Sequence, residues 1–251
     1  MMVTKYSASG NDFVIYHTFL KQERSALAQR ICDRQNGIGA DGLIVLLPHD
    51  TCDCEWEFYN SDGSRAQMCG NGSRAAAHYA YSNALADATM TLMTEAGVIR
   101  AEVQGTMVSS DLTPPHIHEK NIHVNGITWW LLDTGVPHLV TFDVPIEHFN
   151  LQEARELRKR YNANVNIAVV LPNGDLRVRT YERGVEDETL ACGTGMAAVY
   201  YRALMEQRIS GACQVIPKSG ETLYLGMRED VITFKGTVKA CFEVSWNDRS
   251  Q

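Results

Sequence analysis

The sequence predicts an α+β protein made of two pseudo-symmetric halves, each a mixed and mostly antiparallel sheet or barrel rolled around a central helix. Three observations support this fold class. The chain carries an internal repeat of about 125 residues, which is the length of an ordinary domain. Each half has several short strand patterns without regular strand and helix alternation, which disfavours a doubly wound parallel sheet. Each half also has one alanine-rich, almost uncharged helix pattern, and such helices are usually enclosed by other elements.

The repeat is marked by four landmarks that recur in the same order. They are Gly10 with Gly135, Asp41 with Asn166, Tyr59 with Tyr181, and Cys69 with Cys192. A repeat this long is not a solenoid unit, so it indicates two domains. We predict an N-terminal half at residues 1–112 and a C-terminal half at 113–237. The segment 111–125, which contains Pro114 and Pro115, is the expected boundary.

Strands are expected where short β-branched or alternating runs are bounded by turn residues. In the first half these runs are 13–16, 42–47, 55–59, 90–94 and 98–103. Helices are expected at 23–33, 73–85, 151–161 and 195–206. The second and fourth of these are the alanine-rich pair. A sheet curved around each would place the preceding cysteine at its buried end.

The composition describes a globular protein with a small-molecule partner. Of the 251 residues, 45% are hydrophobic, and the formal net charge is −7 at pH 7. An acidic chain without clustered Lys and Arg does not form a nucleic-acid surface. We find neither an apolar stretch of membrane-spanning length nor a signal-peptide segment at the start. We therefore expect a cytoplasmic protein that binds neither nucleic acid nor membrane.

The seven cysteines show no disulfide framework, and in a reducing compartment most of them should be free thiols. Cys52 and Cys54 are separated by one residue. No second pair or histidine cluster follows them at the spacing of a zinc site, so we expect no metal.

Two cysteines stand apart because each opens an alanine-rich helix, in CGNG at Cys69 and in CGTG at Cys192. A helix N-terminus promotes loss of the thiol proton, and the thiolate is both nucleophile and base. The backbone N–H groups that follow can hold a carboxylate, and the glycines allow its close approach. The residues of this cradle are Gly70, Asn71, Gly193 and Thr194. A carboxylate held there would present its α-carbon to both sulfurs, so that one removes a proton and the other returns one to the opposite face.

Longer strings resemble the diaminopimelate epimerase family over nearly the whole chain. They are SGNDFV (9–14), GADG (39–42), FYNSDGS (58–64), MCGNGSRA (68–75), TGVPH (134–138), NVN (164–166) and YERGVEDETLACGTG (181–195). The resemblance implies the family fold, with a C-terminal strand at about 238–251 that returns to the first half. It also implies a cofactor-independent isomerase that converts LL-2,6-diaminopimelate to meso-diaminopimelate for lysine and peptidoglycan precursor synthesis. A homodimer is left open.

The same resemblance assigns roles to individual residues. Cys69 and Cys192 become the catalytic acid and base, and the cradle named above binds the reacting carboxylate. Further substrate-binding positions are Asn11, Asn60, Asn166, Glu182 and Arg183. Arg183 suits the distal carboxylate, because a guanidinium binds a carboxylate with two N–H groups. His138 and Glu182 match a pair that is thought to tune the thiol pKa values.

Two positions depart from the commonest family pattern, and three other functions stay open. Gly42 stands where many members have Gln, and Val136 where many have Asn, so the grip on the far end of the substrate is less defined. A proline or hydroxyproline racemase shares the two-cysteine design but usually has His where this chain has Asn71. A binding protein without chemistry would be expected to lose one cysteine. A nucleotide site is disfavoured, because no P-loop and no complete dinucleotide fingerprint is present.

Overall fold

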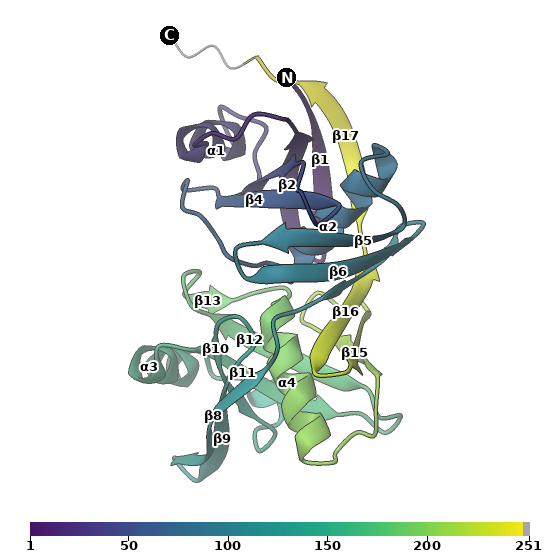
Figure 1. The fold of residues 1–251 in the computed structure, drawn as a ribbon. Helices are drawn as coiled ribbons and strands as arrows, with labels where there is room; N and C mark the ends of the chain where they lie inside the picture. The colour runs from purple at the N-terminus through teal and green to yellow at the C-terminus, as the bar shows by residue number, and fades with distance from the viewer. Residues whose placement is uncertain (248–251) are drawn as a thin grey trace. The chain divides into compact units, whose positions relative to one another are not determined.

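The computed structural model describes residues 1–247 and divides into two units (Figure 1). Unit 1 comprises residues 1–110 and the chain from residue 235 onward, and unit 2 comprises residues 111–234. In unit 1, strand β1 (Met2–Ala8) pairs antiparallel with the last strand, β17 (Lys239–Ser245). This pairing returns the end of the chain to the unit where it began. Residues 248–251, which belong to the expected returning strand, lie outside the described residues.

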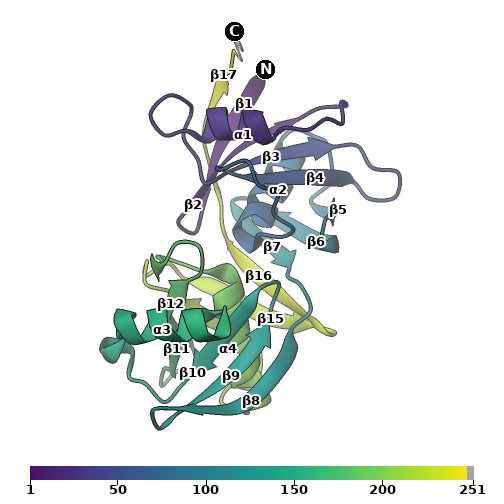
Figure 2. The same cartoon turned by 90° about the vertical axis from the view of Figure 1, so that its left-hand side faces the viewer.

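The strands of unit 1 pair largely in chain order (Figure 2). Besides β1 and β17 they are β2 (Asn11–His17), β3 (Gly42–Leu47), β4 (Cys54–Asn60), β5 (Thr89–Thr94), β6 (Gly97–Gln104) and β7 (Met107–Asp111). β1 and β2 form an antiparallel hairpin, β2 runs parallel to β3, and β3 is antiparallel to β4. β4 then runs parallel to β5, and β5, β6 and β7 follow in antiparallel order.

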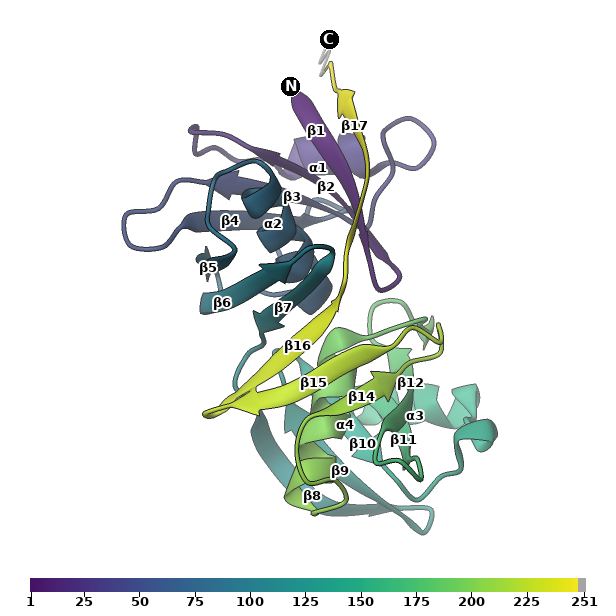
Figure 3. The ribbon, with the colours of Figure 1, turned by 90° about the vertical axis from the view of Figure 1, so that its right-hand side faces the viewer.

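Unit 2 repeats this plan with its own strands (Figure 3). They are β8 (His116–Val124), β9 (Ile127–Asp133), β10 (Pro137–Thr141), β11 (Asn164–Val170), β12 (Leu176–Glu182), β13 (Asp187–Glu188), β14 (Cys213–Ile216), β15 (Leu223–Arg228) and the first part of β16 (Val231–Thr237), which crosses into unit 1 at residue 235. β8, β9 and β10 are antiparallel, β10 runs parallel to β11, and β11 is antiparallel to β12. β12 then runs parallel to β14, and β14 is antiparallel to β15. The same sequence of parallel and antiparallel steps therefore occurs twice.

Each unit encloses one helix. This helix follows β4 in unit 1, and it follows β12 and the short β13 in unit 2. In unit 1 it is α2 (Gly70–Ser82), which contacts β1, β2, β3 and β6. In unit 2 it is α4 (Gly193–Met205), which contacts β9, β10, β11 and β12. Both helices are buried over most of their length, and their small side chains let the strands approach closely. The predicted fold class is thus confirmed.

A second helix in each unit covers the outer face of the sheet. α1 (Ser25–Cys32) packs Leu27 and Ile31 against Val14 and Val45 of the strands. α3 (Leu151–Tyr161), preceded by a short 3₁₀ turn (Ile146–His148), has the same place in unit 2. Because helices cover both faces, β3 is buried along its whole length, which explains its continuous apolar sequence.

The main differences from the sequence predictions lie at helix starts. α2 and α4 begin at Gly70 and Gly193, earlier than predicted, because glycine and asparagine are weak helix formers and hide the first turn. The segment 111–125 is mostly strand β8, with the two prolines just before it. None of the helices in residues 1–247 has the length and apolar character that a membrane-spanning segment requires.

Gly42 tests the packing of this sheet. A Cβ at this position would lie 2.5 Å from the Phe58 ring and 2.8 Å from the carbonyl oxygen of Tyr59. We therefore expect Gly42→Ala to lower the free energy of unfolding by about 1 to 3 kcal/mol, as measured by urea denaturation. The matched control is Gly211→Ala, where nothing lies within 4 Å of an added Cβ. Equal stability of the two variants would contradict this packing argument.

Candidate active site

Cys69 is the N-cap residue of α2. Its backbone is extended, and its sulfur accepts a hydrogen bond from the N–H of Gly72 over 3.4 Å. The N–H of Ser73 is bound by the carbonyl of Cys69. Within residues 1–247, the N–H groups of Gly70 and Asn71 have no acceptor. Such N–H groups at a helix start bind anions, so the start of α2 can hold a carboxylate beside the thiol.

Cys192 has the same place at the start of α4, and it is buried. Its sulfur lies 3.6 Å from the hydroxyl oxygen of Thr194, and its carbonyl accepts from the N–H of Met196. The Thr134 hydroxyl fixes this turn by donating to the carbonyl of Thr194 over 2.8 Å. In the described part of the chain the N–H groups of Gly193 and Thr194 lack acceptors, as at the start of α2.

The predicted substrate-binding side chains of unit 1 lie at one end of its sheet. In the ladder Phe13 pairs with Gly42, and Gly42 pairs with Asn60, so the start of β2 and the end of β4 share an edge. Asn60 donates from Nδ2 to the Ser64 hydroxyl over 2.9 Å. Asn11 and Asn71 hydrogen bond directly, from Nδ2 of Asn71 to Oδ1 of Asn11 over 2.7 Å. The structure therefore brings Asn11 to the first turn of α2.

The corresponding site residues of unit 2 form a buried cluster around His138. Nδ2 of Asn166 lies 2.9 Å from the carbonyl of Leu139 and 3.2 Å from Nδ1 of His138. Oδ1 of Asn166 accepts from the Thr180 hydroxyl over 2.8 Å. A Cβ at Gly195 would lie only 2.5 Å from this same Oδ1. The fourth residue of CGTG, Gly195, must therefore be glycine for Asn166 to pack against the start of α4.

His138 is a neutral base in the folded protein. Burial, followed by the charge of Arg183, lowers its pKa to about 3. A neutral imidazole accepts a hydrogen bond at one nitrogen only. Both ring nitrogens of His138 face amide NH₂ groups, because the Leu139 carbonyl fixes the NH₂ group of Asn166 beside Nδ1 and the Arg183 N–H fixes the oxygen of Asn164. Nε2 lies 3.4 Å from Nδ2 of Asn164.

Glu182 and Arg183 lie half-buried at the end of β12. The backbone of Arg183 donates to Oδ1 of Asn164 over 2.7 Å, and its Nη1 donates to the carbonyl of Asn162 over 3.0 Å. Glu182 pairs with Asp187 in the short β12 and β13 ladder. Arg183 therefore has a fixed backbone beside the His138 cluster, as a residue that binds a carboxylate requires.

Several polar residues around both helix starts were not predicted. They are Ser9, Arg74, Thr134, Asn164 and Thr180. A signal existed for Asn164, because it precedes Asn166 by two residues and strand residues two apart share a face. Arg74 was visible only as one charge in an alanine-rich helix.

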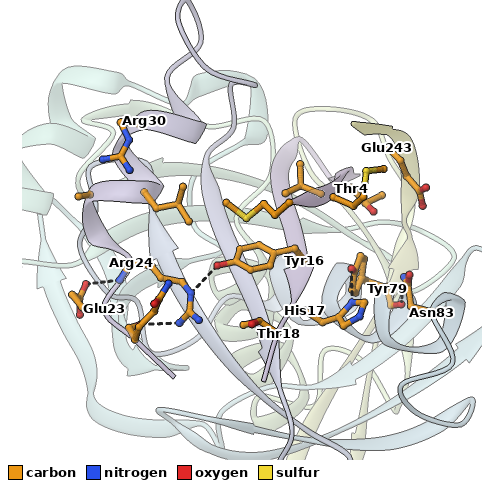
Figure 4. A pocket seen from close by; sticks show the side chains of 16 residues that line it. Thr4, Tyr16, His17, Thr18, Glu23, Arg24, Arg30, Tyr79, Asn83 and Glu243 are labelled. Carbon is orange, nitrogen blue, oxygen red and sulfur yellow. Dashed lines mark hydrogen bonds between the residues drawn. The ribbon is translucent and has the colours of Figure 1, made fainter. Parts of the chain in front are cut away.

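A cavity of about 620 Å³ in unit 1 is lined by none of the predicted site residues (Figure 4). Two pairs of its polar side chains are hydrogen bonded to each other. Nε of Arg24 donates to the Tyr16 hydroxyl over 2.7 Å, and the His17 ring and the Tyr79 hydroxyl are 2.9 Å apart. Within residues 1–247 no three His, Cys, Asp or Glu side chains are grouped so that they could hold a metal ion.

Comparison with known proteins accounts for the repeated cysteine motif. The family model described as diaminopimelate epimerase matches residues 3–117 and 130–238. A diaminopimelate epimerase of Nitratiruptor sp. is 58% identical over 243 residues, covering 97% of this chain and 97% of that protein. The chain belongs to the diaminopimelate epimerase family. A further diaminopimelate epimerase, from Campylobacter jejuni subsp. doylei, is 49% identical and covers 98% of this chain and 99% of its own length.

The fold extends beyond the diaminopimelate epimerase family. A solved structure of a probable proline racemase from Agrobacterium radiobacter superposes with a TM-score of 0.77 at 14% identity. It covers 98% of this chain and 93% of that chain, which shows a shared fold. At Gly42, where many members of the family have Gln, this chain has no room for a side chain, because the Phe58 ring occupies the position of its Cβ.

The lowered pKa of His138 has a measurable effect on stability. Below about pH 6.5 the unfolded chain binds a proton at this residue, but the folded chain does so only near pH 3. As the pH is lowered from 6.5 to 3, the free energy of unfolding should therefore decrease, by up to about 1.4 kcal/mol per pH unit from this residue. We expect His138→Gln to flatten the pH dependence between pH 6.5 and 4, measured by urea denaturation.

The matched control for this experiment is His116→Gln, which replaces an exposed imidazole on β8. An undiminished pH slope in His138→Gln would show that His138 does not carry this linkage.

Proposed function

We propose that this protein epimerises LL-2,6-diaminopimelate to meso-diaminopimelate with Cys69 and Cys192 as the acid and base. The observation that carries the proposal is local and occurs twice. In a chain of this family, each cysteine is the N-cap of a buried helix, and within residues 1–247 the next two N–H groups have no acceptor. A thiol and an anion site are thus combined at each helix start.

The proposed reaction is a balanced proton exchange at one carbon. The thiolate of one cysteine takes the α-proton and becomes a thiol, which leaves a carbanion conjugated with the carboxylate. The thiol of the other cysteine gives its proton to the opposite face and becomes a thiolate. The mechanism requires both thiols to reach the same α-carbon, one from each face. The reverse reaction exchanges the two roles, and no cofactor takes part.

Stabilising the carbanion is the difficult part, because an amino-acid α-proton is much less acidic than a thiol. The cradle of Gly70, Asn71, Gly193 and Thr194 would donate to the carboxylate as its negative charge increases. In other enzymes, removal of one such donor costs about 3 to 4 kcal/mol of transition-state stabilisation. Several donors acting together are therefore needed.

The remaining predicted residues have supporting roles in this proposal. Arg183 and Glu182 would bind the distal carboxylate and ammonium of the substrate. Asn60 and Asn166 would orient the carbon chain that joins this distal end to the reacting end. Support comes from the fixed backbone of Arg183 next to the His138 cluster. His138, which is neutral at pH 7, would act on a thiol as an uncharged imidazole rather than as a cation.

The proposal also includes a cytoplasmic location and a homodimer. Five thiols are free, namely Cys32, Cys52, Cys54, Cys213 and Cys241, which suits a reducing compartment. Exposed Met2 and Phe242, on the paired strands β1 and β17, would suit an interface with a second copy. Light scattering coupled to gel filtration measures the oligomeric state.

Serine substitution tests the two thiols. A hydroxyl is a far weaker acid than a thiol, so Cys69→Ser and Cys192→Ser should each lower the epimerisation rate on the order of 1,000-fold. Chiral chromatography of LL- and meso-diaminopimelate measures this rate. The control is Cys241→Ser, at an exposed thiol on β17, which should retain the full rate.

The same assay separates the alternatives. Near-normal turnover in either Cys69→Ser or Cys192→Ser would refute the two-base assignment. Inversion of proline alone would support a proline racemase, and binding of diaminopimelate without α-hydrogen exchange would support a non-catalytic binding protein.

A further inference from the structure

A continuous chain of hydrogen bonds runs through unit 1 from Arg74 to Asp41. Nη2 of Arg74 donates to Oδ1 of Asn71 over 2.6 Å. Nδ2 of Asn71 donates to Oδ1 of Asn11 over 2.7 Å. Nδ2 of Asn11 then donates to Oδ2 of Asp41 over 3.0 Å. The chain therefore starts at a buried cation, passes through two amides and ends at a carboxylate.

Both ends of this chain are held by further contacts. Nη2 of Arg74 also donates to the Ser9 hydroxyl over 2.7 Å, and its Nη1 lies 3.3 Å from the carbonyl of Thr237. At the other end, Arg34 binds Oδ1 of Asp41 over 2.7 Å, and the backbone N–H of Asp12 binds Oδ2 over 3.1 Å. These contacts leave neither charged group free to move away from its amide.

The opposite charges at the two ends give the chain one direction. If Asn71 turned its amide over, its NH₂ group would face the Arg74 guanidinium, and two donors would meet. If Asn11 turned over, its carbonyl oxygen would face the Asp41 carboxylate, and two acceptors would meet. Because each amide also fixes its neighbour, both must flip together, at a cost at each end.

This direction decides what Asn11 can offer to a ligand. Its oxygen and one N–H are used inside the chain, so the second N–H of its half-buried amide is the group that remains. We propose that Arg74 and Asp41 are positioning residues, which fix Asn11 as a hydrogen-bond donor to a substrate carboxylate at the start of α2. The proposal rests on the proposed function, because it takes Asn11 as a substrate-binding residue.

Among the described contacts of unit 2 there is no equivalent of this hydrogen-bond chain, although the unit has the same fold. In the alignment of the two CGxG motifs, Thr194 stands at the place of Asn71 and Ala197 at the place of Arg74. The start of α4 is instead packed by the neutral Asn166 and Thr180. The charged chain therefore belongs to the binding role of unit 1 and is not required by the fold that both units share.

A double-mutant cycle tests the proposal. Arg74→Met removes the donor at one end of the chain, and Asp41→Asn replaces the acceptor-only carboxylate at the other end with an uncharged amide that can face Asn11 as donor or acceptor. Each should lower kcat/KM for LL-diaminopimelate on the order of 30-fold. In an Asn11→Ala background either change should have less than about a 3-fold effect, because the amide that it positions is gone. Effects that simply multiply would overturn the proposal. The Asp41→Asn arm, at a half-exposed residue, decides the question if Arg74→Met does not fold.

Matched controls exist for both ends. Arg202→Met removes a buried arginine from α4, and Asp53→Asn removes a carboxylate that accepts from the N–H of Thr91. Both should act independently of Asn11→Ala. A loss of folding stability alone would make the Arg74 and Asp41 variants behave like these controls.

A second readout does not depend on activity. The side-chain amide signals of Asn11, assigned by their loss in Asn11→Ala, should shift in the NMR spectrum of Arg74→Met, although no hydrogen bond links Arg74 directly to Asn11 among the described contacts. Unchanged Asn11 signals would refute the proposal that Arg74 positions Asn11 through these hydrogen bonds, even if the enzyme is active. Absence of epimerisation by the unsubstituted protein would refute the proposed function and leave the NMR test of the chain decisive.

Discussion

The structure depends on beginning a helix inside each unit. A helix start has N–H groups with no partner in the helix, and in the interior each of them needs an acceptor. In α2 the sulfur and carbonyl of Cys69 satisfy Gly72 and Ser73, while the N–H groups of Gly70 and Asn71 have no acceptor among residues 1–247, which is what the proposed carboxylate cradle requires. The small side chains of α2 let the strands enclose it. The thiol, the anion site and the burial of both therefore have one origin in the fold.

The two units share a backbone plan but solve the same packing problem with different chemistry. Around α2 the polar groups form a chain between a buried cation and a carboxylate. Around α4 they form a neutral cluster in which burial keeps His138 uncharged. A carbanion that is approached from both faces needs two similar frames. Its substrate, however, has one reacting end and one distal end, so the frames need not carry the same charges.

The features that were predictable from the sequence are those that local residue patterns determine. β3 and α3 have the predicted bounds, because a continuous apolar run defines the first and the Asn150 cap begins the second. The internal repeat and the position of the two cysteines at helix starts were also predicted, because the motifs that mark them recur in the sequence. The first turn of α2 was missed, because Gly70 and Asn71 are weak helix formers that only the surrounding sheet holds in place.

What could not be predicted depends on residues that are distant in the chain. Arg74 is bound by Ser9 and by the carbonyl of Thr237, which its helix sequence does not reveal. The neutral state of His138 results from complete burial between strands. Strand β8 was hidden by the prolines before it, since its pairing with β9 forms only when the hairpin closes.

The most direct test of the account is the distribution of deuterium after brief reaction of LL-diaminopimelate in D₂O. If two thiols act from opposite faces, the meso product formed at low conversion carries deuterium at the inverted carbon, while the recovered LL substrate keeps its hydrogen. Equal deuterium in the product and in the recovered substrate would indicate a single base that exchanges with solvent. That result would contradict the two-thiol account.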